Sequence, residues 1–135
     1  VVNAVLNQKF HLAREQGTSM IFKVGDMSGM RLNEEETVIL LSNLLDNAIR
    51  ECVKVVKAGR KAVIHIKLVQ EDGKIIFSVK NPVVEKVQIT DGIVQDSNGG
   101  MHGIGLSNVK AVVDKYGGDF VISCDSEKFQ AVVML

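Results

Sequence analysis

The run of residues 34–58 constrains the fold most, because it combines helical periodicity with an apolar surface over much of its circumference. Its apolar side chains are Val38, Leu41, Leu45, Ile49, Cys52 and Val56 on one stripe, with Leu40, Leu44 and Ala48 beside them. A helix this apolar is expected to be buried over most of its surface. Asn33 followed by Glu36 predicts its start through a capping box, and Gly59 predicts its end.

Four polar side chains interrupt this apolar surface at helical spacing: Asn43, Asn47, Arg50 and Lys54. At about 100° per residue, the four fall within roughly a 60° arc of the helix. Buried amides that lack hydrogen-bond partners cost about 1–3 kcal/mol each. The polar stripe must therefore be satisfied by neighbouring parts of the protein or by a ligand, and the helix by itself leaves both possibilities open.

The rest of the chain predicts further helices and strands. In chain order, the expected elements are a helix at 1–15, a strand at 19–24, the central helix, a β-hairpin at 62–70 and 74–80, an irregular segment at 83–102, a helix at 106–116, and a second strand pair at 119–124 and 129–135. Asp72 and Gly73 supply the turn of the first hairpin. This order predicts an α/β two-layer sandwich, in which a mixed, mostly antiparallel sheet of about five strands is covered on one face by three helices.

The length of 135 residues suits one domain. We expect that domain to span residues 1–135 and to be a fragment of a longer chain, because the sequence begins with Val1 inside a predicted helix. The 16 basic and 16 acidic residues give a net charge of zero, which is no reason to expect a nucleic-acid or anionic-membrane partner. No apolar run approaches the ~20 residues that span a bilayer.

A glycine-rich segment at residues 99–105 leads into the third predicted helix. Glycines allow close approach of the backbone to a phosphate, and a helix N-terminus offers free N–H donors. The segment is not the dinucleotide-binding fingerprint, because Asn108 stands where the third glycine should be, and no Gly-Lys-Ser/Thr of a Walker A loop follows. Taken alone, it is compatible with phosphate binding and with a plain loop.

The amide stripe and the glycine-rich segment together resemble the ATP-binding domain of the GHKL superfamily, which includes gyrase, a heat-shock chaperone, histidine kinases and MutL. The Asn-Leu-Leu-Asp-Asn-Ala sequence at 43–48 resembles the N box, and Gly-Ile-Gly-Leu at 103–106 resembles the G2 box. The helix that follows ends in Tyr116, Gly117 and Gly118, as it does in that family. The order and spacing of the elements match over nearly the whole chain.

Within the superfamily, the chain looks most like the catalytic domain of sensor histidine kinases of the peptide-pheromone quorum-sensing type. The resemblance implies that Asn47 binds Mg²⁺ and that Arg50 or Lys54 reaches phosphate oxygens. Asn43 occupies the position at which ATP-hydrolysing relatives carry a general-base Glu. Because an amide is not a useful proton acceptor, Asn43 fits a kinase and disfavours a hydrolytic ATPase.

The resemblance also assigns the remaining parts of an ATP site. The backbone of Gly103 and Gly105, with Ile104 and Leu106 completing the G2 box, would hold the triphosphate. The segment 83–102 would be the ATP lid. Within it, Ser97 precedes the G2 box without the nearby Lys that related lids carry, so one phosphate contact is missing or comes from another residue.

The lid would also include His102, which adjoins the G2 glycines and could help to order it. The G1 box departs from the family pattern, because it is reduced to Asn81 and Pro82. The family's Asp accepts a hydrogen bond from the adenine amino group. Asn81 can accept one through its amide oxygen but without charge assistance, so we expect nucleotide binding weaker by ~1 kcal/mol or more.

The function implied is that of the catalytic domain of a two-component sensor histidine kinase. It would bind Mg-ATP and donate the γ-phosphate to a histidine on a dimerisation domain outside this chain, with a response regulator as a further partner. The domain would be the cytoplasmic portion of a membrane-anchored parent and would not touch the membrane. His11 lacks the neighbours of a phosphoacceptor motif, so we expect it to be a surface residue, and His65 is expected to face solvent. The alternative is a degenerate GHKL fold with weak or no nucleotide binding that acts through protein contacts.

Overall fold

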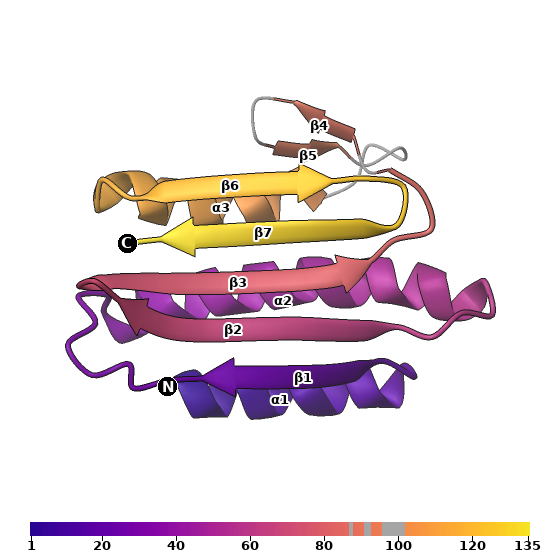
Figure 1. The fold of residues 1–135 in the computed structure, drawn as a ribbon, viewed down its shortest axis with the longest axis horizontal. Coiled ribbons are helices and arrows are strands. Elements are labelled where there is room, and N and C mark those ends of the chain that lie inside the picture. Colours follow the sequence, from indigo (N-terminus) through magenta and orange to yellow (C-terminus); the bar gives the residue numbers. More distant parts are fainter. Residues whose placement is uncertain (87, 91–92, 96–101) are drawn as a thin grey trace.

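The computed structural model is a two-layer open sandwich, in which three helices lie behind one face of a sheet (Figure 1). It describes residues 1–86, 88–90, 93–95 and 102–135, without the side chains of 88–90, 93–95 and 102–104. The elements are α1 (Val2–Glu15), β1 (Ser19–Val24), α2 (Glu34–Lys57), β2 (Val63–Glu71), β3 (Lys74–Pro82), β4 (Gln88–Thr90), β5 (Ile93–Gln95), α3 (His102–Lys115), β6 (Asp119–Cys124) and β7 (Lys128–Met134).

The main sheet has five strands in the order β1-β2-β3-β7-β6, and β4 pairs with β5 in a separate two-stranded sheet. β1 runs parallel to β2, and the other neighbours are antiparallel. The turn between β2 and β3 has positive φ at both Asp72 (52°) and Gly73 (76°), as a type I′ hairpin turn requires. The fold predicted from the sequence is therefore confirmed.

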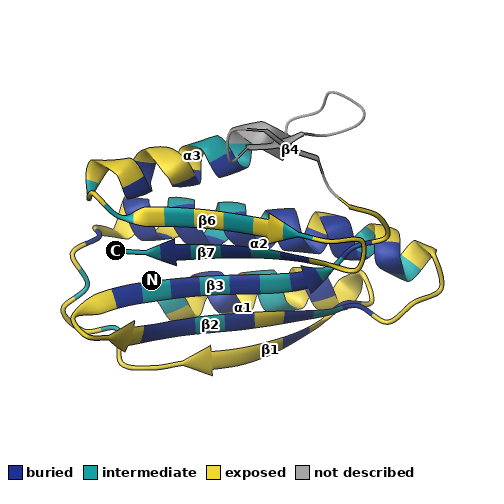
Figure 2. Cartoon of the chain, turned by 45° about the horizontal axis from the view of Figure 1, so that its top comes forward, coloured by how far each residue is buried: buried dark blue, intermediate teal, exposed yellow. Residues whose placement is uncertain are grey.

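The sheet buries one face and leaves the other open. Along β3, Ile75, Phe77, Val79 and Asn81 are buried, while the residues between them are half-buried, and Figure 2 shows this alternation. Successive strand residues point to opposite faces, so the buried set faces the helices and the other set lies on the helix-free face. No helix in the described part of the chain is long and apolar enough to cross a membrane.

α2 is the central helix of the covered face and packs against α1, α3 and β3. Leu40, Leu41, Leu44 and Leu45 are at most 1% exposed. One member of the predicted apolar stripe behaves differently, because Val38 is 41% exposed. Periodicity predicted which face of the helix would be buried, but not that Val38 near its start would be exposed.

The start of α2 is fixed by the predicted capping box. The Asn33 side chain accepts a hydrogen bond from the Glu36 backbone N–H (2.7 Å), and the Glu36 carboxylate accepts one from the Asn33 N–H (3.0 Å). The same buried carboxylate is bound by the end of α3. Lys115 Nζ lies 2.6 Å from Glu36 Oε2, and the Tyr116 hydroxyl donates to Oε1. Glu36 thus joins the beginning of one helix to the end of another.

Two boundaries differ from the prediction. The segment 83–102 was expected to be irregular, yet it contains the short strands β4 and β5. Strands of three residues are too short to give a detectable alternation. The third helix begins at His102 rather than at 106, so Gly103 and Gly105 lie in its first turn and not in a loop before it.

Gly118 connects α3 to β6 and has no room for a side chain. A Cβ placed there would lie 2.4 Å from the Met134 carbonyl oxygen and 2.8 Å from Leu135 Cδ2. We expect Gly118→Ala to lower the free energy of unfolding by about 1–3 kcal/mol, because a backbone atom must move. Urea unfolding measures this effect. The exposed Ser126→Ala serves as the control, and equal stability of the two variants would contradict the packing described.

Glu36 should make stability depend on pH. Hydrogen bonds from Lys115, then from Tyr116 and the Asn33 backbone, lower the pKa of Glu36 from 4.5 to about 2. A carboxyl with a lower pKa in the folded state stabilises the protein above its unfolded pKa. That stabilisation is lost as the pH falls from about 4.5 towards 2.

Glu36→Gln should therefore be less stable than the wild type at neutral pH, and the difference should shrink as the pH falls through this window. Urea unfolding at a series of pH values measures it. Glu34→Gln is the matched control, because Glu34 is exposed in the same first turn. If the difference in unfolding free energy between the wild type and Glu36→Gln stays constant down to pH 2, the charge of Glu36 is not involved.

Candidate functional site

Asn43 on α2 faces the first turn of α3. Its side-chain Nδ2 donates to the Ile39 carbonyl (2.8 Å), which fixes the amide orientation. The other end of the amide lies against Gly105, because a Cβ built on that glycine would be 3.1 Å from Asn43 Oδ1. The close approach of α2 to α3 at this point therefore depends on the glycine. The two motifs that the sequence singled out separately meet here in space.

Asn47 lies one turn further along α2 and is only 5% exposed. It has an interaction partner within the protein. Together with the Asn43–Ile39 bond, this answers part of the question raised by the polar stripe. A protein group binds the Asn43 amide and Asn47 has a partner in the protein, so the stripe does not depend on a ligand alone.

The polar stripe leaves the core after Asn47. Arg50 and Lys54 are exposed, and Lys54 Nζ pairs with Glu51 at 3.2 Å. Glu51 is a carboxylate only 4% exposed, and it was not among the site residues predicted from the sequence. A signal was present, because Glu51 follows Asn47 by four residues and so continues the same helix face.

Asn81 ends β3 on the covered face of the sheet and is 2% exposed. Its Nδ2 donates to the Pro82 carbonyl (2.9 Å). Its Oδ1 is buried and has no hydrogen-bond partner among the described residues. An orphaned buried acceptor costs about 1–3 kcal/mol. A donor group brought by a ligand would remove that cost, and an amino group on an aromatic base is such a donor.

Among the other residues predicted to form the site, the structure describes the side chain of Leu106 but not those of the others. Leu106 is 1% exposed and belongs to the core, so any contact with a ligand would come from its backbone. His102, Gly103 and Ile104 lie in the first turn of α3, where their side chains are not described. Ser97 lies outside the described residues. The predictions for His11 and His65 are confirmed, since both are exposed.

Amides dominate the possible metal ligands at this site. Among the described residues, no group of three or more His, Cys, Asp or Glu side chains is arranged to hold a metal ion. Mg²⁺ accepts few protein ligands and completes its shell with waters and phosphate oxygens. A magnesium ion that arrived with a phosphate ligand would therefore need few ligands from this site.

The fold is shared with known kinase structures. It matches the histidine kinase domain of the blue-light activated histidine kinase of Erythrobacter litoralis EL346, with a TM-score of 0.71 at 14% identity over 99% of this chain and 58% of that chain. The histidine kinase AdeS of Acinetobacter baumannii matches with a TM-score of 0.69 at 16% identity over 98% of this chain and 63% of that chain. The chain thus spans less than two thirds of either protein.

A third structure is covered more fully. The catalytic domain of the histidine kinase ThkA matches with a TM-score of 0.73 at 18% identity, over 98% of this chain and 90% of that chain. No curated protein sequence matches the chain. The family model described as the GHKL domain matches residues 32–135, from just before α2 to the last residue. On this match over most of its length, the chain belongs to the GHKL domain family.

Proposed function

We propose that this chain is the ATP-binding catalytic domain of a two-component sensor histidine kinase. In this proposal it binds Mg-ATP between α2 and α3 and donates the γ-phosphate to a histidine outside the chain. The observation that carries the proposal is the contact of Asn43 with Gly105, which joins the N box to the G2 box. Membership of the GHKL family and the fold shared with the ThkA catalytic domain support it.

The phosphates would lie at the first turn of α3. Free backbone N–H groups at a helix N-terminus and the positive end of its dipole favour an anion there. Gly103 and Gly105 would allow the triphosphate to approach that backbone. Arg50 is exposed on the same stripe of α2 and would reach phosphate oxygens, whereas Lys54 is already paired with Glu51.

Asn47 is the proposed Mg²⁺ ligand. When bound, the ion would neutralise the negative charge of the phosphates. Asn43 would position the phosphates without activating water, because an amide does not accept a proton at neutral pH. Transfer to a histidine then depends on positioning and on charge neutralisation.

Asn81 is the proposed contact to the adenine. Its unpartnered Oδ1 would accept a hydrogen bond from the exocyclic amino group, which would satisfy a buried acceptor. A neutral amide gives a weaker bond than a carboxylate would. Affinity for ATP should therefore be modest.

The proposal also covers the ATP lid, the partner proteins and the parent kinase. Residues 83–102, with Ser97 and His102, would form the ATP lid. The dimerisation domain of the parent kinase would supply the phosphoacceptor, and a response regulator would receive the phosphate. The parent would be a membrane-anchored kinase of the peptide-pheromone quorum-sensing type, with this domain, residues 1–135, in the cytoplasm.

A second candidate is a GHKL fold that binds nucleotide weakly or not at all and acts through protein contacts. The neutral Asn81 favours it, as do the protein partners that Asn43 and Asn47 already have. Measurements of nucleotide binding separate the two candidates.

Calorimetry with ATP, with and without Mg²⁺, tests the proposal directly. The wild type should give a Mg²⁺-dependent heat, and Asn47→Ala should weaken Mg-ATP binding by about tenfold or more, because the variant loses a metal ligand. Asn108→Ala, an exposed position on α3, is the control. If the wild type gives no Mg²⁺-dependent heat at millimolar ATP, the kinase proposal fails for this chain and the second candidate stands.

Gly105→Ala tests the contact between the two boxes. The new Cβ would lie 3.1 Å from Asn43 Oδ1, so the amide must shift by a few tenths of an ångström. We expect ATP affinity to fall about fivefold, or ~1 kcal/mol, the worth of one hydrogen bond. Thermal stability should hold or rise, because Ala is the better helix former. Unchanged affinity alongside unchanged stability would show that the contact does not shape the nucleotide site.

A further inference from the structure

A cavity of about 550 Å³ lies at the end of the sheet where β2 begins and β3 ends. Its charged lining comes from three separate segments of the chain. Arg60 and Lys61 precede β2, Lys80 lies on β3, and Glu127 and Lys128 lie at the turn before and the start of β7. Four cationic side chains therefore face one carboxylate, in a chain whose net charge is zero. We call this the sheet-end cavity.

The cavity reaches the helix-free face of the sheet. Lys80 lies between Val79 and Asn81, which are both buried against the helices, so its side chain points to the opposite face. His65 also lines the cavity and is the register partner of Lys80 on β2. The contact of Asn43 with Gly105 lies on the covered side of the sheet, so most of the cavity lining is separate from the proposed nucleotide site. Asn81 is the lining residue that the cavity shares with the proposed nucleotide site.

The cations of the cavity form no ion pair with a described carboxylate. The Asp125 carboxyl has a lowered pKa, chiefly through a hydrogen bond from the Glu127 backbone, and the nearby Lys128 helps to lower it. Elsewhere in the described chain, some lysines form ion pairs, for example Lys9 with Asp46 at 2.8 Å and Lys110 with Asp114 at 2.9 Å. None of the four cavity cations forms such a pair with a described residue, and Arg60 donates only to the Val83 carbonyl at 3.4 Å. Like charges gathered in one hollow repel one another, and a bound anion would relieve that repulsion.

We propose that the sheet-end cavity binds a small phosphorylated molecule with at least two negative charges. Its volume lies in the range of about 300–1,000 Å³ that is usual for small-molecule sites. Lysine and arginine donors from three segments can surround phosphate oxygens. An adjoining hollow of about 390 Å³ shares Lys80 and Lys128 and adds the carboxylate of Asp125. Ser123 and Gln130 also line it and offer polar contacts to the uncharged part of such a molecule.

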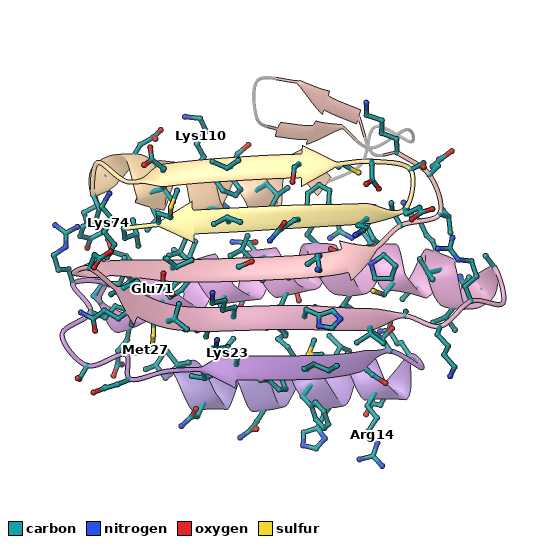
Figure 3. The ribbon with its side chains drawn as sticks, viewed as in Figure 1. Arg14, Lys23, Met27, Glu71, Lys74 and Lys110 are labelled. Carbon is teal, nitrogen blue, oxygen red and sulfur yellow. The ribbon has the colours of Figure 1, made fainter. Side chains whose placement is uncertain are left out.

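Inorganic pyrophosphate without Mg²⁺, at low ionic strength, is the probe. Calorimetry should detect binding to the wild type, and Lys80→Gln/Lys128→Gln should weaken it about tenfold, because each exposed ion pair contributes a few-fold to affinity. The matched control is Lys67→Gln/Lys110→Gln, which removes two charges outside the cavity. Lys110 lies on α3 (Figure 3). Glu71 and Lys74 lie at the end of the sheet opposite the cavity (Figure 3). The control should bind as the wild type does.

Amide NMR of the wild type gives a readout that needs no variant to fold. Pyrophosphate should shift the signals of residues 60–61, 65, 80 and 127–128. Three results would overturn the proposal: no binding to the wild type, an equal loss in the control variant, or a loss that follows Arg50→Gln instead. The last result would assign the anion to the nucleotide site. The proposal is independent of the kinase assignment, since Lys80→Gln/Lys128→Gln should keep the Mg²⁺-dependent heat with ATP if the wild type has it.

Discussion

The burial of α2 beneath the middle of the sheet is the constraint on which the rest of the structure depends. Its leucines at 40, 41, 44 and 45 are almost fully enclosed by α1, α3 and β3. Fully burying one such side chain contributes about 1.5–3 kcal/mol. A helix enclosed in this way tolerates a polar side chain only where a partner is at hand. The positions of Asn43 and Asn47 are therefore determined together with the core, and so is the place where α3 must pass.

One polar contact and one close approach fix how α2 and α3 lie along each other. At the start of α2, Glu36 holds Lys115 and Tyr116 from the end of α3. Further along α2, Asn43 meets Gly105 in the first turn of α3. Because each contact joins a different pair of turns, a sliding movement of one helix would break both. The geometry of the candidate site is thus supported by an ion pair at the opposite end of the helix pair.

Local rules made much of the fold predictable from the sequence. The capping box at Asn33 gave the start of α2, and Asp72 with Gly73 gave the first hairpin, because both signals depend on neighbouring residues only. β4 and β5 escaped prediction because three-residue strands carry too little pattern. Glu36 was recognised as a cap, but its partners on α3 lie about 80 positions away in the chain and leave no local signal.

The candidate site and the sheet-end cavity were likewise predictable only where the signal lies in neighbouring residues. The residues of the N box and the G2 box were found from the sequence, because each box is a short motif. Their meeting at Asn43 and Gly105 is a property of the packed helices. Glu51 was overlooked because a carboxylate on a helix is ordinarily exposed, and its burial becomes apparent only in the structure. The sheet-end cavity was invisible for a further reason: its cations come from three distant segments, and none of those segments is basic enough to stand out alone.

The strand pairing described above has a consequence for the order in which the protein folds. The β2–β3 and β6–β7 pairs are hairpins whose strands adjoin in the chain, so each can close quickly. The β1–β2 pair must wait for the whole of α2 to turn back, and the β3–β7 pair must wait for α3. Loop closure of this kind is the slow part of folding in mixed α/β domains. The helices that carry the N box and the G2 box are therefore also the connections whose docking completes the sheet.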